Sequence, residues 1–110
     1  VSFITKGIQN WTTQREELYN NIKILPSAKI VARGVQGNRK AVVAWTNNYK
    51  GTRVFSTSIG HNNVTVADSR YLKLVARGLL WAVKREDMKI INPKNETFDL
   101  NSKPKASSAK

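Results

Sequence analysis

The hydrophobic period of the chain changes once, near residue 60, and this change limits the folds that the sequence can form. Before it, the runs AVVAWT (41–46) and TRVFSTS (52–58) are rich in β-branched and aromatic residues, and the turn-forming segment NNYKG separates them. After it, apolar residues recur every three or four positions between Ser69 and Arg85, with Asp68 placed as the N-cap. The sequence therefore predicts a β-hairpin followed by an amphipathic helix.

The N-terminal segment carries weaker signals. Residues 1–11, VSFITKGIQNW, show no sustained period and are predicted to form a loop or a short extended segment. Thr13 then stands three residues before Glu16, which is the spacing of a capping box. This spacing predicts a short helical turn, ended by the asparagine pair at 20–21.

Two short apolar runs precede the predicted hairpin. IKILP (22–26) and AKIVARG (28–34) are both typical of strands, and a turn is expected at Gly37. At the other end of the chain the pattern is lost, and the sequence becomes rich in proline, serine and lysine. We therefore expect one folded unit over residues 1–91 and a partly ordered arm with a disordered tail over 92–110.

The composition bounds the chain to one domain. With 110 residues it buries enough surface for a single hydrophobic core. The absence of cysteine excludes disulfides, thiolate zinc sites and a cysteine nucleophile, and leaves the cellular compartment open. No apolar run approaches the roughly 20 residues that span a bilayer, so we expect no membrane partner. The composition indicates no particular cofactor or oligomeric state.

The formal net charge is +12, and its distribution is uneven. No acidic residue lies between Leu18 and Ala67. The basic residues of this stretch include Lys23, Lys29, Arg33, Arg39, Lys40 and Arg53. Their scattered spacing favours a solvated basic surface, and a module that binds nucleic acid or an acidic polymer is the alternative.

Several motifs of the second half recur, in the same order and at similar spacing, in a known family. The positions concerned are Trp45, Arg53, Val54, Phe55, Gly60, His61, Gly78, Trp81 and Ala82. Together they resemble the C-terminal part of trehalose-utilisation (ThuA-like) domains. The upstream segments ITKGIQNW and EELYNNI extend the resemblance to Ile4–Arg85. The chain departs from the family at Gly51-Thr52, where a Gly beside the Arg is usual, and at Arg15-Glu16-Glu17, where an Asp is more usual.

This resemblance implies an α/β fold of the flavodoxin-like, three-layer type found in class I glutamine amidotransferase-like proteins. The chain would supply the C-terminal part of that fold, and some of its apolar surface would face the strands that it lacks. The resemblance also implies a protein of carbohydrate utilisation that acts on trehalose, a related disaccharide or an oxidised sugar. Whether the protein is a carbohydrate-processing enzyme is left open. Glutaminase chemistry is excluded, because the chain has neither a cysteine nor a Gly-x-Ser-x-Gly elbow. A basic non-catalytic module and an inactive fragment are the alternatives.

His61 is the candidate catalytic residue. It is the only histidine, and it stands where a strand is expected to end and a loop leads to the helix. Open α/β sheets place their ligands at this edge. Gly60 permits a positive φ, so the imidazole is available as a general acid/base or a metal ligand, and the alternative is a hydrogen bond within the loop. No second histidine or cysteine completes a metal site, so none is predicted.

Four further residues are candidates for substrate binding. Glu17 and Tyr19 form a polar cluster with Glu16, in which carboxylates accept hydrogen bonds from sugar hydroxyls and the ring stacks on a pyranose; for Glu16, helix capping is an equal alternative. Arg53 would anchor a carboxylate or phosphate if it faced the cleft, and would otherwise be paired or solvated. Asn62 offers an amide to sugar hydroxyls, and it also suits a tight loop.

Overall fold

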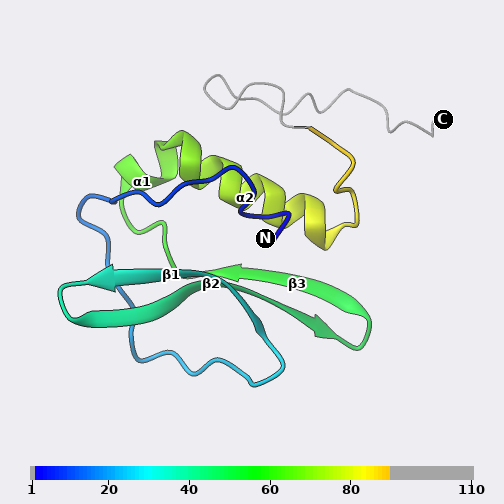
Figure 1. The fold of residues 1–110 in the computed structure, drawn as a ribbon, viewed down its shortest axis with the longest axis horizontal. Coiled ribbons are helices and arrows are strands. Elements are labelled where there is room, and N and C mark those ends of the chain that lie inside the picture. The colour runs from blue at the N-terminus through cyan, green and yellow to red at the C-terminus, as the bar shows by residue number, and fades with distance from the viewer. Residues whose placement is uncertain (1, 90–110) are drawn as a thin grey trace.

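The computed structural model describes residues 2–89 and forms a small α/β unit. Its elements are β1 (Lys29–Gln36), β2 (Arg39–Tyr49), β3 (Thr52–Thr57), α1 (Asn63–Ala67) and α2 (Ser69–Ala82). Helix α2 lies across one face of the sheet beside the N-terminal segment, drawn in dark blue, and the segment that leads into β1 passes on the other side of the sheet (Figure 1). Among the described residues no helix is long and apolar enough to cross a membrane.

The sheet is an antiparallel meander in the order β1-β2-β3. Gly37 takes a φ of 61° in the turn between β1 and β2, as expected for a residue without a Cβ. Lys50 and Gly51 close the second hairpin with φ values of 51° and 86°. The predicted hairpin over 41–58 and the predicted strand over 28–34 are therefore confirmed. Strands β1 and β2 continue beyond their predicted ends, whereas β3 ends one residue earlier than predicted.

The predicted helix is also confirmed, with Asp68 as its N-cap. The Asp68 side chain accepts a hydrogen bond from the backbone N–H of Arg70 at 2.7 Å. The helix ends at Ala82 and not at Arg85, because Lys84 takes a left-handed φ of 59°. The N–H of Arg85 then donates to the Leu80 carbonyl at 2.7 Å, which satisfies an orphan carbonyl at the helix end.

The core lies between α2, the sheet and the N-terminal segment. Ile4, Ala44 and Leu74 are 1%, 0% and 2% exposed. Two arginines of α2 hold the N-terminal segment against the helix: Arg77 donates to the backbone carbonyl of Lys6, and Arg70 stands over the Trp11 ring. The N-terminal segment is thus part of the packed structure, although it forms no regular element.

Two expectations for the N-terminal segment are wrong. No helical turn forms after Thr13, because Arg15 takes a left-handed φ of 54° and the Glu16 side chain is bonded to a distant loop instead of capping a helix. The run 22–26 is not a strand: Pro26 lies in a turn in which the Ala28 N–H donates to the Leu25 carbonyl. Proline has no N–H to offer to a sheet, which disfavours pairing here.

The class of the fold is α/β, as predicted, with a three-stranded antiparallel sheet and two helices. In the part of the chain that the structure describes, both helices are drawn on one side of the sheet (Figure 1). The predicted arm and tail over 92–110 lie outside the described residues.

Candidate functional site

The loop between β3 and α1 leaves the sheet at Ser58 and is tightly packed at Gly60. Gly60 has a φ of 122°, and a Cβ added there would lie 2.8 Å from the Tyr71 hydroxyl oxygen. Its positive φ agrees with the expectation from the sequence. The loop is therefore pressed against α2 on one side, and only glycine fits at this point.

On its other side, the loop is held by the carboxylate of Glu16. Oε1 accepts hydrogen bonds from the backbone N–H groups of Gly60 at 3.2 Å and His61 at 3.1 Å, and Oε2 accepts one from Asn62 at 3.1 Å. Three consecutive donors thus meet one carboxylate. We call this arrangement the Glu16 clamp.

The surroundings of the clamp favour the ionised form of Glu16. Partial burial raises the pKa of this carboxyl, but the nearby Thr65 hydroxyl and the three backbone N–H groups lower it more, and the net pKa is below its ordinary value of 4.5. Thr65 is 2% exposed. Its hydroxyl is close enough to the carboxylate to act on the pKa, although the geometry falls short of a hydrogen bond. Glu16 is therefore a charged, fully engaged group.

Three of the predicted site residues come together beside the clamp. His61 Nε2 lies 3.6 Å from Glu17 Oε1, and the two side chains are 51% and 52% exposed. The nearby Glu17 carboxylate, by its polar interaction with the hydroxyl and by its negative charge, raises the pKa of Tyr19, with smaller contributions from burial and then from the charge of Glu16. We call His61, Glu17 and Tyr19 the surface triad. It presents an imidazole, a carboxylate and a phenol to solvent.

Asn62 stands next to the triad and has a structural task. Its side-chain oxygen accepts a hydrogen bond from the Val64 N–H at 2.7 Å and caps α1. The amide oxygen of Asn62 therefore stabilises the tight loop, as one of the two interpretations of this residue predicted. The nitrogen of the same amide has no hydrogen-bond partner among the described residues, and Asn62 is half-buried.

The structure does not bring Arg53 to the triad. Arg53 lies near the start of β3, whereas His61 follows its end. Its Nη1 donates to the Trp81 carbonyl and to Glu86 Oε2, both at 2.9 Å, and its guanidinium stands 5.0 Å from the centre of the Trp81 ring. A substrate-binding role for Arg53 stays a prediction. The contacts that it makes tie β3 to the end of α2.

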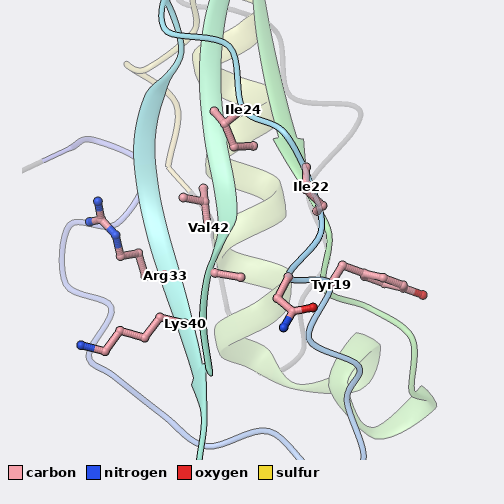
Figure 2. A pocket seen from close by; sticks show the side chains of 8 residues that line it. Tyr19, Ile22, Ile24, Arg33, Lys40 and Val42 are labelled. Atoms are coloured by element: carbon pink, nitrogen blue, oxygen red, sulfur yellow. The ribbon is translucent and has the colours of Figure 1, made fainter. Parts of the chain in front are cut away.

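A shallow groove of about 290 Å³ lies between the segment that leads into β1 and the β1–β2 hairpin. Its lining residues are Tyr19, Asn20, Ile22, Ile24, Arg33, Lys40, Ala41 and Val42. In Figure 2, Arg33 and Lys40 extend to one side of the hairpin, while the Tyr19 ring points to the other. The groove therefore has a basic rim and an aliphatic lining, and the hydroxyl of Tyr19 belongs to the triad.

Within residues 2–89, no group of three histidine, cysteine or acidic side chains is placed to hold a metal ion. Glu16 and Glu17 lie near His61, but both oxygens of Glu16 are occupied by backbone N–H groups. The chemistry open to the triad is proton transfer and hydrogen bonding. An imidazole beside a carboxylate is a pairing suited to general acid–base catalysis.

The clamp is the part of the site that the sequence did not reveal. Thr13 and Glu16 match a capping box, and this local explanation was the simpler one. The true partners of Glu16 are 44 to 46 positions away along the chain. A single sequence has no local signal for such a contact.

Comparison with known proteins gives one match. A family model described as trehalose utilisation (ThuA) matches residues 1–82, which include every element of the fold and the whole of the site. Neither a curated protein nor a solved structure matches the chain.

Proposed function

We propose that this chain, which belongs to the trehalose utilisation (ThuA) family, binds a carbohydrate at the surface triad. The family description supports a role in trehalose utilisation in a general sense. The finer proposal is that the ligand is trehalose, a related disaccharide or an oxidised derivative of one. The observation that carries it is the meeting of His61, Glu17 and Tyr19 at the loop that follows β3.

Each group of the triad suits a polyhydroxylated ligand. The Glu17 carboxylate accepts hydrogen bonds from sugar hydroxyls, and the Tyr19 hydroxyl donates or accepts them. The free N–H group of Asn62 would add a donor at the margin of the site. If the intact domain is an enzyme, His61 exchanges a proton with a hydroxyl or with a carbon beside the carbonyl of an oxidised sugar. Glu17 then stabilises the imidazolium at 3.6 Å.

A finer assignment of the fold belongs to the same proposal. We propose that the sheet and helices form one part of a flavodoxin-like, three-layer unit related to class I glutamine amidotransferases. Apolar side chains on an outer stripe of α2 and at its C-cap support this, since Leu72, Leu79 and the C-cap residue Val83 are 43%, 55% and 55% exposed. On the sheet, Ile30 and Val54 are also exposed. Such surfaces are typical of elements that are covered in a larger fold.

Titration of the 15N-labelled 110-residue chain with trehalose tests the proposed function. We expect the resonances of Glu17, Tyr19 and His61 to move with sugar concentration and the melting temperature to rise. His61→Ala and Glu17→Gln should abolish these changes while the remaining amide resonances keep their positions. Glu86→Gln is the matched control, because it neutralises a paired glutamate at the other end of β3. Resonance changes that are spread over the surface, or that survive both site variants, would rule out the triad as the binding site.

A second candidate function is supported by the basic rim of the groove. Arg33 pairs with Val42 and Lys40 with Val35, so register places both cations on the same face of the hairpin. Neither makes an ion pair with a carboxylate in the part of the chain that the structure describes. An acidic polymer or nucleic acid would find two unpaired charges there. Nucleic acid is the less favoured partner, because other basic residues such as Arg53 are already paired.

Retention on a heparin column as a function of salt tests this second function. If the rim binds polyanions, the double variant Arg33→Gln and Lys40→Gln should elute from the column at a lower salt concentration than the wild type. Lys50→Gln combined with Lys84→Gln removes the same number of cations from the second hairpin turn and the end of α2, and is the control for net charge. Equal retention of the two variants would show that only total charge matters and would remove the basic rim as a site.

A further inference from the structure

We propose that Glu16 is a positioning residue of the candidate site, which fixes the His61 imidazole beside Glu17 through the backbone of the loop. This inference rests on the proposed function for its meaning, because the triad is the group that it positions. That Glu16 fixes the position of the imidazole is a structural inference that does not depend on sugar binding. Among the described residues, no hydrogen bond or ion pair joins Glu16 to the imidazole, so Glu16 positions His61 through the backbone of the loop.

Two adjacent residues contact the loop: Glu16 bonds to its backbone, and Glu17 approaches the His61 side chain. Glu16 directs its carboxylate to the N–H groups of Gly60, His61 and Asn62, and the next residue, Glu17, directs its carboxylate to His61 Nε2. The backbone between the two glutamates is short and inextensible. Any shift of the clamp along the loop therefore changes the separation between Glu17 and the imidazole.

Few other contacts hold the His61 side chain in place. Its side chain is half exposed, and its only polar contact among the described residues is the 3.6 Å approach to Glu17. The position of the imidazole thus depends on its own backbone. That backbone is held by its hydrogen bond to the Glu16 carboxylate, and the preceding Gly60 is packed against the Tyr71 hydroxyl.

Only an ionised carboxylate on a side chain of this length accepts hydrogen bonds from all three N–H groups of the loop. A glutamine has one acceptor oxygen, and its amide N–H group would face the loop's own donors. An aspartate keeps the charge, but it is one methylene shorter and cannot reach all three N–H groups from the same backbone position. The lowered pKa of Glu16 agrees with a role that needs the charged form.

The test compares Glu16→Gln with Glu86→Gln in the 15N-labelled 110-residue chain. Both substitutions neutralise a paired glutamate of lowered pKa, but Glu86 pairs with Arg53, away from the loop. We expect Glu16→Gln to move the amide resonances of Gly60, His61 and Asn62 and the imidazole resonances of His61. It should also weaken trehalose binding about tenfold, which corresponds to the loss of one charge-assisted hydrogen bond. Glu86→Gln should do neither.

The outcomes separate this inference from the proposed function. If the wild-type chain binds no trehalose, the proposed function fails, and the imidazole resonances alone decide the inference. If those resonances keep their wild-type positions in Glu16→Gln, the positioning role is overturned, whatever happens to binding. A loss of binding in Glu86→Gln as large as that in Glu16→Gln would overturn it too, because a general loss of stability would then explain both.

A measurement on the wild-type chain covers the case in which Glu16→Gln does not fold. On acidification, the amides of Gly60, His61 and Asn62 should shift together in one transition below pH 4.5, as the clamp carboxyl takes up its proton. Glu17, Tyr19, His61 and Tyr71 are the other titratable groups that face this loop, and their own resonances are followed in the same spectra. Three amides that titrate independently, or not at all, would contradict the clamp.

Discussion

Gly78 of α2 lies directly over the ring of Phe55 in β3, so that a Cβ added to this glycine would come within 2.4 Å of Phe55 Cδ2. This is the closest approach of helix and sheet among the glycines of the described residues. We predict that Gly78→Ala lowers the free energy of unfolding by about 1–3 kcal/mol, because overpacking outweighs the roughly 1 kcal/mol that alanine gains over glycine in a helix. Urea denaturation measures the change.

A double-mutant cycle is the control for this prediction. Phe55→Leu removes part of the ring that the new methyl group would meet. In the Phe55→Leu background, Gly78→Ala should therefore cost much less than in the wild type. An equal cost in both backgrounds would show that the contact with Phe55 is not the cause.

Asp68 gives a prediction about pH. Its hydrogen bonds with the Arg70 side chain, opposed by partial burial and helped by the backbone N–H of Arg70, lower its pKa from 3.8 to about 2. A carboxyl whose folded pKa is depressed stabilises the fold above its unfolded pKa, and this contribution is lost as the pH falls through the folded pKa. We therefore expect stability from Asp68 to be complete above about pH 4 and to disappear toward pH 2.

Two variants separate the charge of Asp68 from its capping role. Asp68→Asn keeps an acceptor for the Arg70 N–H but cannot ionise. The difference in melting temperature between wild type and Asp68→Asn should be largest near neutral pH and shrink toward pH 2. Asp68→Ala also loses the cap, which costs a further 1 kcal/mol or so. A difference between wild type and Asp68→Asn that is constant with pH would contradict the assignment.

Arg53 is expected to affect stability and not sugar binding. Arg53→Met keeps much of the aliphatic length but loses both hydrogen bonds and the guanidinium over the Trp81 ring. We predict a loss of about 1–2 kcal/mol of unfolding free energy, and a smaller loss for Glu86→Gln, which leaves the bond to the Trp81 carbonyl. Trehalose binding by folded Arg53→Met tests the predicted substrate-binding role, which a large loss of binding would support.

Gly60 gives a prediction for the loop of the site. Gly60→Ala meets two obstacles, a φ of 122° that disfavours any L side chain and the Tyr71 hydroxyl at 2.8 Å. We expect this substitution to destabilise the fold and to shift the amide resonances of His61 and Asn62. Adding Tyr71→Phe removes the steric conflict with the hydroxyl but leaves the backbone strain, so the rescue should be partial. Full rescue would show that the conformation of Gly60 carries no strain.

The sequence predicts those parts of the fold whose determinants are local. The hairpin over 41–58 has its turn residues between two β-branched runs, and α2 has an N-cap followed by an unbroken helical period. The N-terminal segment could not be predicted, because its conformation depends on partners outside it. Arg77 and Arg70 of α2 hold the part that contains Lys6 and Trp11, and the loop after β3 holds Glu16.

The same distinction applies to the site. His61 could be singled out because it follows a glycine at the end of a predicted strand, and the structure places Glu17 and Tyr19 beside it. Arg53 carried no local signal to distinguish an anchor for substrate from a partner of Glu86. Glu16 had a local signal, but it indicated a cap that does not form. For both Arg53 and Glu16, the partners of the side chain lie far away in the sequence.

The length of chain that the Glu16 clamp closes has a consequence for the order of folding. Both hairpins and α2 form from residues close in sequence, whereas the clamp joins positions 44 to 46 apart, and the entropy of closing such a loop delays its formation. We expect Gly78→Ala to slow refolding and substitutions of Glu16 mainly to speed unfolding, which stopped-flow kinetics would resolve. The triad would then be assembled in the last step, so that a chain with its hairpins and helix in place still lacks a binding surface until Glu16 reaches the loop.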